Sequence, residues 1–197
     1  GDLGGLTKKA QEVGDILSAS GKDIIIYETV GVGQGELDVS KAVDLTIVVL
    51  VPESGDEVQL MKAGLIEIAD LFVINKSDRD GSNRLAQSLT SILHSFSKKD
   101  SLIPPVYSTS ANNGDGIENF YNGLKEIHSL MHNKGLLDKK KLERHKNRIL
   151  NLVQERLLSN FWTKKKMNQL KLSIDSINSI KVSHYDVMKK LFEDKSV

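Results

Sequence analysis

Four short runs of apolar, mostly β-branched residues, separated by stretches of helical periodicity, constrain the fold of this chain most strongly. The runs are DIIIYETV at 23–30, DLTIVVLV at 44–51, DLFVI at 70–74 and PVYST at 105–109. The helical stretches are 6–19, 57–69, 84–96 and 117–132. A continuous apolar run indicates a strand that is covered on both faces, which is typical of a parallel sheet. The alternation of strand and helix therefore predicts a doubly wound α/β domain.

The chain changes character near Asn133, and this change predicts a second, helical domain. Residues 1–133 hold 11 Lys or Arg against 19 Asp or Glu, whereas residues 134–171 hold 12 against 3. Helical periodicity then covers 138–162, 165–174 and 185–192, and no strand-like run follows. We expect an α/β domain over residues 1–133 and a helical arm over residues 134–197, which packs on the domain or on a second copy.

The composition argues against several kinds of site and partner. The sequence has no Cys, so disulfides and thiolate metal sites are excluded. It has no apolar run of roughly 18 residues, so we expect no membrane span. The basic stretch includes Lys139–Lys141 and Lys164–Lys166, but the aromatic residues that stack on nucleic-acid bases are absent apart from Phe161 and Trp162. We therefore expect no nucleic acid, and a basic helix face that meets solvent, the acidic domain or a partner.

Asn75-Lys76-Ser77-Asp78 follows the third apolar run directly, and this placement predicts a guanine site at the carboxyl end of a strand. Guanine presents N1–H and N2–H as adjacent donors, and the Asp78 carboxylate can accept from both. The Asn75 amide can reach N7 and also tie neighbouring loops together, and the Lys76 stem can lie along the base. Adenine offers Asp78 the wrong donor pattern, so the carboxylate rejects it.

Polar and glycine-rich residues follow two other apolar runs, at the same predicted edge of the sheet. Ligands of doubly wound sheets bind beyond the carboxyl ends of the strands. Glu28 ends the first run and can hold Mg²⁺ through water, and Gly31 lets the backbone approach a γ-phosphate. Ser110 and Ala111 lie in a small-residue loop whose backbone N–H groups can reach guanine O6. Asp115 is expected to cap the helix that follows, and a simple turn would also explain each loop by itself.

These motifs together resemble the methylmalonyl-CoA mutase-associated GTPases of the MeaB/ArgK/MMAA group. The resemblance lies in DIIIYETVGVGQ at 23–34, the loop 52–62 with Gly64, DLFVINKSD at 70–78 and the opening Leu3-Gly4-Gly5-Leu6. It covers residues 2–160 and implies a P-loop GTPase-type domain with a C-terminal helical dimerisation appendage. It also implies a homodimeric metallochaperone of the bacterial cytosol or the mitochondrial matrix. Such a chaperone hydrolyses GTP to GDP with Mg²⁺, and it gates adenosylcobalamin delivery to methylmalonyl-CoA mutase, or a related mutase, and protects it.

The resemblance implies a role for particular positions of this sequence. Glu28 would lie near the metal and Gly31 near the γ-phosphate, and Gln34 is a candidate for orienting the attacking water. The guanine pocket would comprise Asn75, Lys76, Asp78, Ser110 and Ala111. A third switch, which relays the nucleotide state to the mutase, would use Asp56, Gln59 and Lys62.

The sequence departs from the family in one large respect. It has no Gly-x-x-x-x-Gly-Lys-Ser/Thr phosphate-binding loop and no first switch. We therefore expect the chain to be a C-terminal portion of the GTPase, which binds guanine nucleotides weakly and hardly hydrolyses GTP by itself. A non-catalytic module that binds the mutase or dimerises without a phosphate site remains an alternative. A related metallochaperone for nickel or zinc enzymes is another, although the lack of Cys and of His-rich tracts counts against it.

Overall fold

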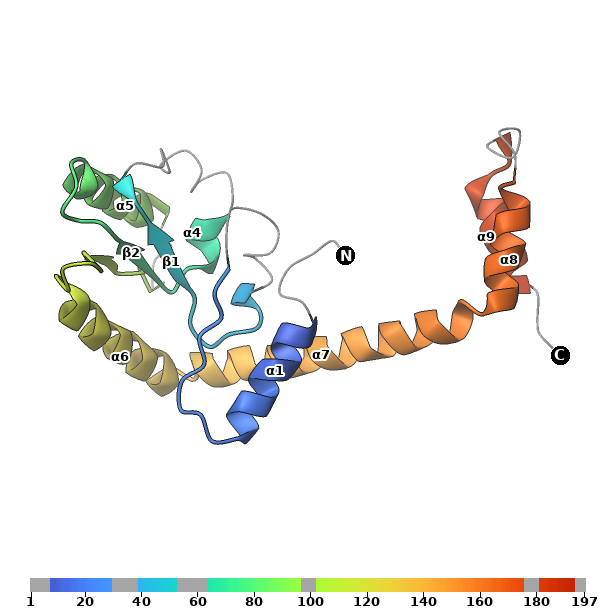
Figure 1. The fold of residues 1–197 in the computed structure, drawn as a ribbon, viewed down its shortest axis with the longest axis horizontal. Coiled ribbons are helices and arrows are strands. Elements are labelled where there is room, and N and C mark those ends of the chain that lie inside the picture. The colour runs from blue at the N-terminus through green and yellow to red at the C-terminus, as the bar shows by residue number, and fades with distance from the viewer. Residues whose placement is uncertain (1–7, 30–38, 53–63, 97–101, 176–180, 194–197) are drawn as a thin grey trace. The chain divides into compact units, whose positions relative to one another are not determined.

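A computed structural model describes residues 8–29, 39–52, 64–96, 102–175 and 181–193 of the chain (Figure 1). The chain divides into two compact units, unit 1 from Gly1 to Arg144 and unit 2 from His145 to Val197. This division falls inside helix α7, which runs from Leu136 to Phe161. The boundary that we expected after residue 133, between an α/β domain and a helical arm, stays a prediction.

Unit 1 is built on a parallel sheet, as the apolar runs predicted. Its strands are β1 (Ile47–Leu50), β2 (Leu71–Ile74) and β3 (Val106–Ser108), and they pair in the order β1-β2-β3. Ile47 pairs with Leu71, and Phe72 with Val106, in parallel register. The mixed α/β class and the parallel sheet are therefore confirmed.

The helices of unit 1 follow the predicted periodicity closely. They are α1 (Lys8–Ala19), α4 (Leu65–Ile68), α5 (Ser82–Phe96), α6 (Ile117–Asn133) and the beginning of α7. The helix expected over 57–69 is described only from residue 64 onward, where α4 occupies its last turn. The predicted cap at Asp56 lies outside the described residues.

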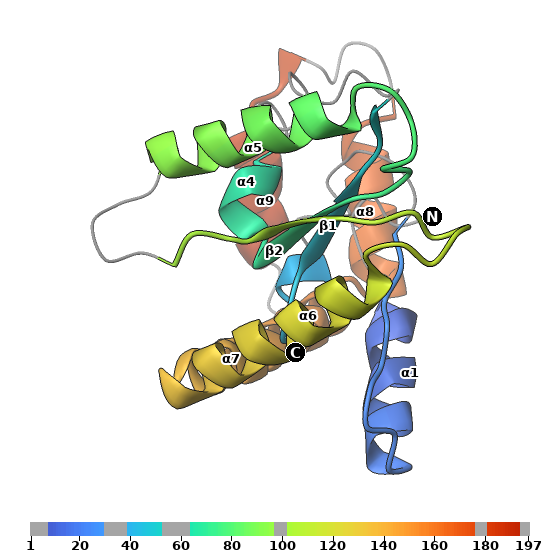
Figure 2. The ribbon, with the colours of Figure 1, turned by 90° about the vertical axis from the view of Figure 1, so that its left-hand side faces the viewer.

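Alternating side chains of β2 belong to two hydrophobic clusters, one on each face of the sheet. Phe72 and Ile74 pack with Leu85 and Leu89 of α5, whereas Leu71 and Val73 pack on the α6 side with residues such as Ile127. Figure 2 shows α5 and α6 on opposite faces of the sheet. All four residues of β2 are buried. The central strand is therefore fixed by packing on both sides, and its carboxyl end is a rigid place for a site.

Two expectations about the strands need correction. The run at 23–30 was expected to be a buried strand, but residues 24–29 have no regular secondary structure, and Ile24 and Ile26 are 74% and 85% exposed. An extended run is stabilised by backbone pairing with a neighbouring strand, and no strand of the described residues pairs with it. Strand β1 was also expected to be buried on both faces, but only one of its faces is buried. Ile47 and Val49 on the other face are 38% and 59% exposed, because the hydrophobic cluster on the α6 side packs on β2 and β3.

The segment before Glu28 is anchored to α1 by a close side-chain contact. The Tyr27 hydroxyl lies so near Gly14 of α1 that a Cβ at this glycine would overlap it. Burial, followed by the nearby Asp15 carboxylate, raises the pKa of the Tyr27 hydroxyl above its ordinary value of 10.0. The phenol therefore stays neutral, and the contact holds residues 24–29 near α1 without any strand pairing.

The first turns of α7 are tied to the amino ends of β1 and β2 by a group of polar contacts that we call the α7 latch. Lys140 Nζ donates to both carboxylate oxygens of Asp70, at 2.9 and 2.7 Å, and to the Asp44 carbonyl at 3.2 Å. Arg144 donates to Asp44 Oδ1 at 2.6 Å. The backbone N–H of Thr46 completes the shell of Asp70 at 2.8 Å. Part of the basic stretch therefore meets acidic groups of the α/β unit, which was one of the outcomes expected for it.

Unit 2 contains the rest of α7, α8 (Lys164–Ser173) and α9 (His184–Glu193). Thr163 caps α8, because its side-chain oxygen accepts from the Lys166 backbone N–H at 3.3 Å. The Lys166 ammonium donates to the Leu191 carbonyl near the end of α9, and Leu191 is buried. The α8 and α9 helices therefore form a packed pair, which we call the α8–α9 hairpin.

Candidate guanine-binding site

The turn that follows β2 has an unusual backbone conformation. Lys76 has a φ of 59°, the one positive φ outside glycine in the described residues. A side chain in this left-handed region costs conformational energy, and such positions cluster at functional sites. The turn is held to the loop after β3, because Ser77 N–H donates to the Thr109 carbonyl at 2.9 Å and Thr109 N–H donates to the Ile74 carbonyl at 2.8 Å. The two strand ends therefore form one connected structure.

The Asp78 carboxylate is oriented by Ser110. Ser110 Oγ donates to Asp78 Oδ1 at 2.6 Å, across 32 residues of sequence. Ser110 is 1% exposed, so its hydroxyl is fixed, whereas Asp78 itself is exposed. This hydrogen bond is the largest of the effects that lower the pKa of Asp78 below its ordinary value of 3.8. Asp78 thus presents an ionised acceptor, which the Ser110 hydroxyl holds in place, to any ligand that reaches this edge of the sheet.

The Asn75 side chain ties the two loops together from the other side. Asn75 Oδ1 accepts from the Ala111 backbone N–H at 3.1 Å and from Thr109 Oγ1 at 3.4 Å. The sequence assigned the Ala111 N–H to guanine O6, but in this structure it donates to Asn75. With its oxygen engaged in this way, the Asn75 amide has its NH₂ group left to face a ligand.

The loop from Ser110 to Ile117 is closed by backbone contacts. Ser110 N–H donates to the Asp115 carbonyl at 2.9 Å, and Gly114 N–H donates to the Ser110 carbonyl at 2.8 Å. The expectation that Asp115 caps α6 is wrong: the cap is Gly116, with a φ of 73° and no side-chain hydrogen bond. A Cβ at Gly116 would overlap the Ser108 carbonyl, so glycine is needed where α6 approaches the end of β3.

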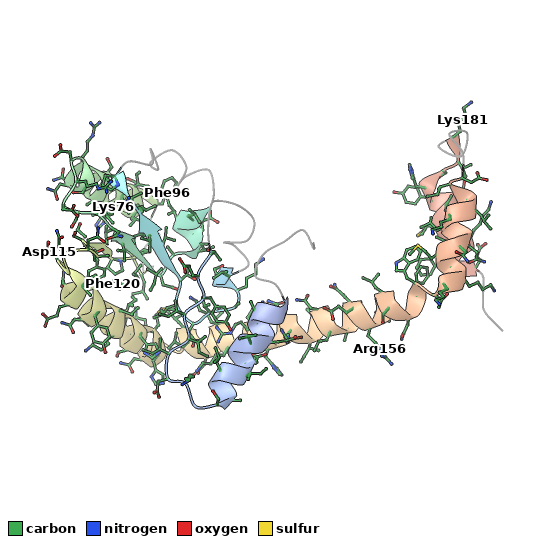
Figure 3. All side chains as sticks on the ribbon, viewed as in Figure 1. Lys76, Phe96, Asp115, Phe120, Arg156 and Lys181 are labelled. Atoms are coloured by element: carbon green, nitrogen blue, oxygen red, sulfur yellow. The ribbon has the colours of Figure 1, made fainter. Side chains whose placement is uncertain are left out.

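The arrangement brings a carboxylate and an amide to the same edge of the sheet. Lys76 and Asp115 lie at the same end of unit 1 in Figure 3, beyond the carboxyl ends of the strands. The Asp78 carboxylate can accept from a pair of adjacent N–H donors, and Asn75 supplies an amide from the same turn. A ligand with two neighbouring N–H donors on one edge and an acceptor on the next edge fits this donor and acceptor set.

The other residues singled out in the sequence are placed only in part. Glu28 is exposed on the irregular segment after Tyr27. Five predicted positions lie outside the described residues: Gly31, Gln34, Asp56, Gln59 and Lys62. Within the described ranges, no group of three or more His, Cys, Asp or Glu side chains could hold a metal ion. The role of Glu28 near a metal stays a prediction.

Sequence reasoning missed two residues that shape the site. Thr109 joins Asn75 through its hydroxyl and Ser77 through its carbonyl, and it is 2% exposed. Gly116 allows α6 to begin close to Ser108. A glycine directly before a helical stretch was a signal for such a close approach, whereas the contact of Thr109 with Asn75 depends on two loops 34 residues apart.

Comparison with known proteins decides the family. The model of the family described as "Methylmalonyl Co-A mutase-associated GTPase MeaB" matches residues 1–166 of this chain. The chain belongs to this family. Among its relatives, a protein of Pyrococcus horikoshii whose name describes a GTPase is 38% identical over 156 residues, which are 78% of this chain and 49% of that protein.

Two further relatives are proteins of mouse and of Escherichia coli. The mouse protein "Methylmalonic aciduria type A homolog, mitochondrial" is 38% identical over 167 residues, 83% of this chain and 40% of that protein. "GTPase ArgK" of Escherichia coli is 32% identical over 166 residues, 82% of this chain and 50% of that protein. This member of the MeaB family therefore spans about half the length of the relatives that it matches. No helix in the described part of the chain is both long and apolar enough to cross a membrane.

Proposed function

We propose that this chain is the guanine-recognising part of a GTPase that serves an adenosylcobalamin-dependent mutase. The complete GTPase would hydrolyse GTP to GDP and phosphate with Mg²⁺, and would gate the delivery of adenosylcobalamin to methylmalonyl-CoA mutase or a related enzyme. The observation that carries the proposal is the Asp78 carboxylate, fixed by Ser110 at 2.6 Å next to the Asn75 bridge. Membership of the mutase-associated GTPase family supports the same role.

Within this proposal, Asp78 accepts from N1–H and N2–H of guanine, and Ser110 positions the carboxylate. The Asn75 NH₂ group donates to N7, and the aliphatic stem of Lys76 covers one face of the base. Ala111 N–H turns from Asn75 towards O6 when the base enters. The remaining assignments rest on the family: Gly31 near the γ-phosphate, Glu28 near Mg²⁺, Gln34 near the attacking water, and Asp56, Gln59 and Lys62 in the loop that senses the partner.

The proposal expects this chain to bind guanine nucleotides weakly and to hydrolyse GTP negligibly by itself. The residues proposed to contact the base lie in this chain, but its sequence holds no phosphate-binding loop. Phosphate contacts supply much of the affinity and nearly all of the catalysis in GTPases. A dissociation constant below about 1 μM for GDP with Mg²⁺ would contradict the expectation that this chain binds guanine nucleotides weakly.

The decisive experiment replaces the Asp78 carboxylate, which is proposed to accept hydrogen bonds from the base, with an amide. The 197-residue chain and its Asp78→Asn variant are titrated with GDP and with xanthosine diphosphate, and binding is followed by NMR. Because xanthine has a carbonyl where guanine has its 2-amino group, the Asn amide can donate to it. We expect the variant to lose about a hundredfold in GDP affinity relative to xanthosine diphosphate.

A matched control is Asp80→Asn, which removes an exposed carboxylate two residues further on. This variant should keep the preference of the unaltered chain for GDP. An unchanged preference in Asp78→Asn would refute guanine recognition by this pocket. Failure of the unaltered chain to bind GDP at millimolar concentration would also refute it, and would favour a non-catalytic module.

A further inference from the structure

Three buried hydroxyl groups in the described part of the chain donate to one short turn, residues 75–78. Two of these donors, Thr109 and Ser110, come from the loop after β3 and belong to the candidate site. The third is Ser82, whose Oγ donates to the Ser77 carbonyl at 2.9 Å. Ser82 is 3% exposed, so water does not compete for this hydrogen bond. A residue beyond the guanine motif therefore takes part in holding the turn.

Ser77 is held on both sides of its backbone. Its N–H donates to the Thr109 carbonyl at 2.9 Å, and its carbonyl accepts from Ser82. Ser77 directly follows Lys76, whose φ of 59° is unfavourable for a side chain of this kind. Such a backbone conformation persists only where the surrounding contacts fix it. The Ser82 hydroxyl is thus one of two anchors that fix the turn beside Asp78.

The Ser82 hydroxyl acts on the peptide group that joins Ser77 to Asp78. In a trans peptide the C=O and N–H bonds point in opposite directions within one plane, and the described residues contain no cis peptide. With the carbonyl directed to Ser82, the Asp78 N–H is directed the other way, towards the Asp78 carboxylate. After the Ser110 hydroxyl, this N–H is the next cause of the lowered pKa of Asp78. Holding one end of the peptide group therefore holds a donor to the carboxylate at its other end.

Ser82 itself has a rigid support. Helix α5 begins at this residue. Leu85 and Leu89 of the helix share a hydrophobic cluster with Ile74, the last residue of β2. The same strand leads into the turn, so core packing sets the position of the hydroxyl relative to the turn.

We propose that Ser82 is a positioning residue of the guanine site, which orients the Ser77–Asp78 peptide group so that the Asp78 carboxylate meets both N1–H and N2–H of the base. This role of Ser82 rests on the proposed function. Two parallel hydrogen bonds to one carboxylate constrain its orientation more than a single bond does. Hypoxanthine has N1–H but no 2-amino group, so its binding should depend less on Ser82. Ser82 would therefore contribute to the preference for guanine over hypoxanthine.

The test compares two nucleotides that differ only in the 2-amino group. The 197-residue chain and its Ser82→Ala variant are titrated with GDP and with inosine diphosphate, in the presence of Mg²⁺, and binding is followed by NMR. The ratio of the two dissociation constants measures the contact with N2–H. We expect Ser82→Ala to lower the preference for GDP by about threefold. A variant that is only less stable would bind both nucleotides less well by the same factor, so its ratio would not change.

Two further variants are the controls. Ser91→Ala removes a hydroxyl that donates to the Gln87 carbonyl, also at 2.9 Å, further along α5. It should keep the ratio of the unaltered chain. Asp78→Asn removes the acceptor itself and should abolish the preference for GDP. If Ser82→Ala does not give the amide spectrum of a folded chain, Ser82→Cys takes its place, because a thiol of similar size donates only weakly.

A second measurement needs no nucleotide. The ¹³C shift of the Asp78 carboxyl carbon is followed against pH in the unaltered chain and in the serine variants. We expect the midpoint to lie at higher pH in Ser82→Ala, because the Asp78 N–H is then less well directed to the carboxylate. Ser91→Ala should have the midpoint of the unaltered chain.

The outcomes separate this role of Ser82 from guanine recognition. An unchanged ratio in Ser82→Ala, with the preference lost in Asp78→Asn, would refute the role of Ser82 alone and leave Ser82 as a contact that fixes the start of α5. An unchanged Asp78 midpoint in Ser82→Ala would refute the orientation of the peptide group. No preference for GDP in the unaltered chain would instead refute guanine recognition, and the role of Ser82 with it.

Discussion

At the scale of single residues, the hydrogen bond from Ser110 orients the Asp78 carboxylate and lowers its pKa. Ser110 Oγ donates to Asp78 Oδ1 at 2.6 Å and is the leading cause of the lowered pKa of Asp78. A carboxyl group whose pKa is lowered by folding stabilises the folded protein above its ordinary pKa, and loses that contribution as the pH falls through the lowered value. Guanine binding needs the ionised form, so it should be lost over the same acid range.

The first prediction concerns Ser110→Ala, which removes the donor. The pKa of Asp78 should rise towards 3.8, so the carboxylate of the variant should protonate at a higher pH than that of the unaltered chain. The ¹³C shift of the Asp78 carboxyl carbon, followed against pH, measures this directly. Thr109→Ala is the control, because the Thr109 hydroxyl donates to Asn75 and not to Asp78. Equal midpoints in Ser110→Ala and the unaltered chain would mean that the hydrogen bond does not lower the pKa of Asp78.

Residue-level reasoning from the sequence reached the polar ends of β2 and β3, and it expected Asn75 to tie neighbouring loops together, but it did not name the partners of Asn75. The position of Asp78 after an apolar run and the small residues at Ser110 and Ala111 were visible in the sequence. The bridges from Asn75 to Thr109 and Ala111 join loops that the sheet brings together, so they follow only from the register of β2 and β3. The left-handed backbone of Lys76 has no signal in its residue type, because Lys is not favoured there.

At the scale of elements, the sequence predicted helices better than strands. Helix α5 was expected at 84–96 and found at Ser82–Phe96, because its apolar spacing is a local property. A strand needs neighbours, and this is why DIIIYETV remained irregular at 24–29 although its composition is as strand-like as that of β2. Ile24 and Ile26 have no paired strand beside them among the described residues, and their exposure follows.

The second prediction concerns the α7 latch, which joins a helix to the amino ends of two strands. Lys140→Met keeps an apolar stem but removes the ammonium, so Asp70 loses its donor at 2.7 Å. The side chains of Lys140 and Asp70 are 32% and 15% exposed, so water partly replaces the lost contact. We expect a loss of roughly 1–2 kcal/mol in the free energy of unfolding, measured by urea denaturation.

The control for the latch is Lys141→Met, which removes an exposed ammonium one residue further along α7. This variant should change the free energy of unfolding by less than about 0.5 kcal/mol. The loss in Lys140→Met should shrink at high salt, since screening weakens the ion pair in the unaltered chain. If both variants unfold at the same urea concentration, the latch does not stabilise unit 1.

At the scale of the whole molecule, the two units differ in charge and in the apolar surface that they expose. Residues 1–144 hold 16 Lys or Arg against 21 Asp or Glu, and residues 145–197 hold 11 against 5. In unit 2, Ile149, Val153 and Leu157 of α7 are 48%, 49% and 63% exposed. Their spacing of four residues places them on one side of the helix. A long helix with exposed apolar side chains repeated at this spacing is typical of a surface that pairs with a copy of itself.

The last prediction is that this side of α7 forms a homodimer, as the family resemblance implies. Val153→Asp places a charge in the middle of the apolar side, and two copies would bring those charges together in a symmetric interface. Sedimentation equilibrium should show a dimer for the unaltered chain and a monomer for Val153→Asp. Asn151→Asp adds the same charge at an exposed position on the polar side of the helix, and should remain dimeric. A chain that is monomeric at every concentration, or a Val153→Asp variant that still dimerises, would exclude α7 as the contact between copies.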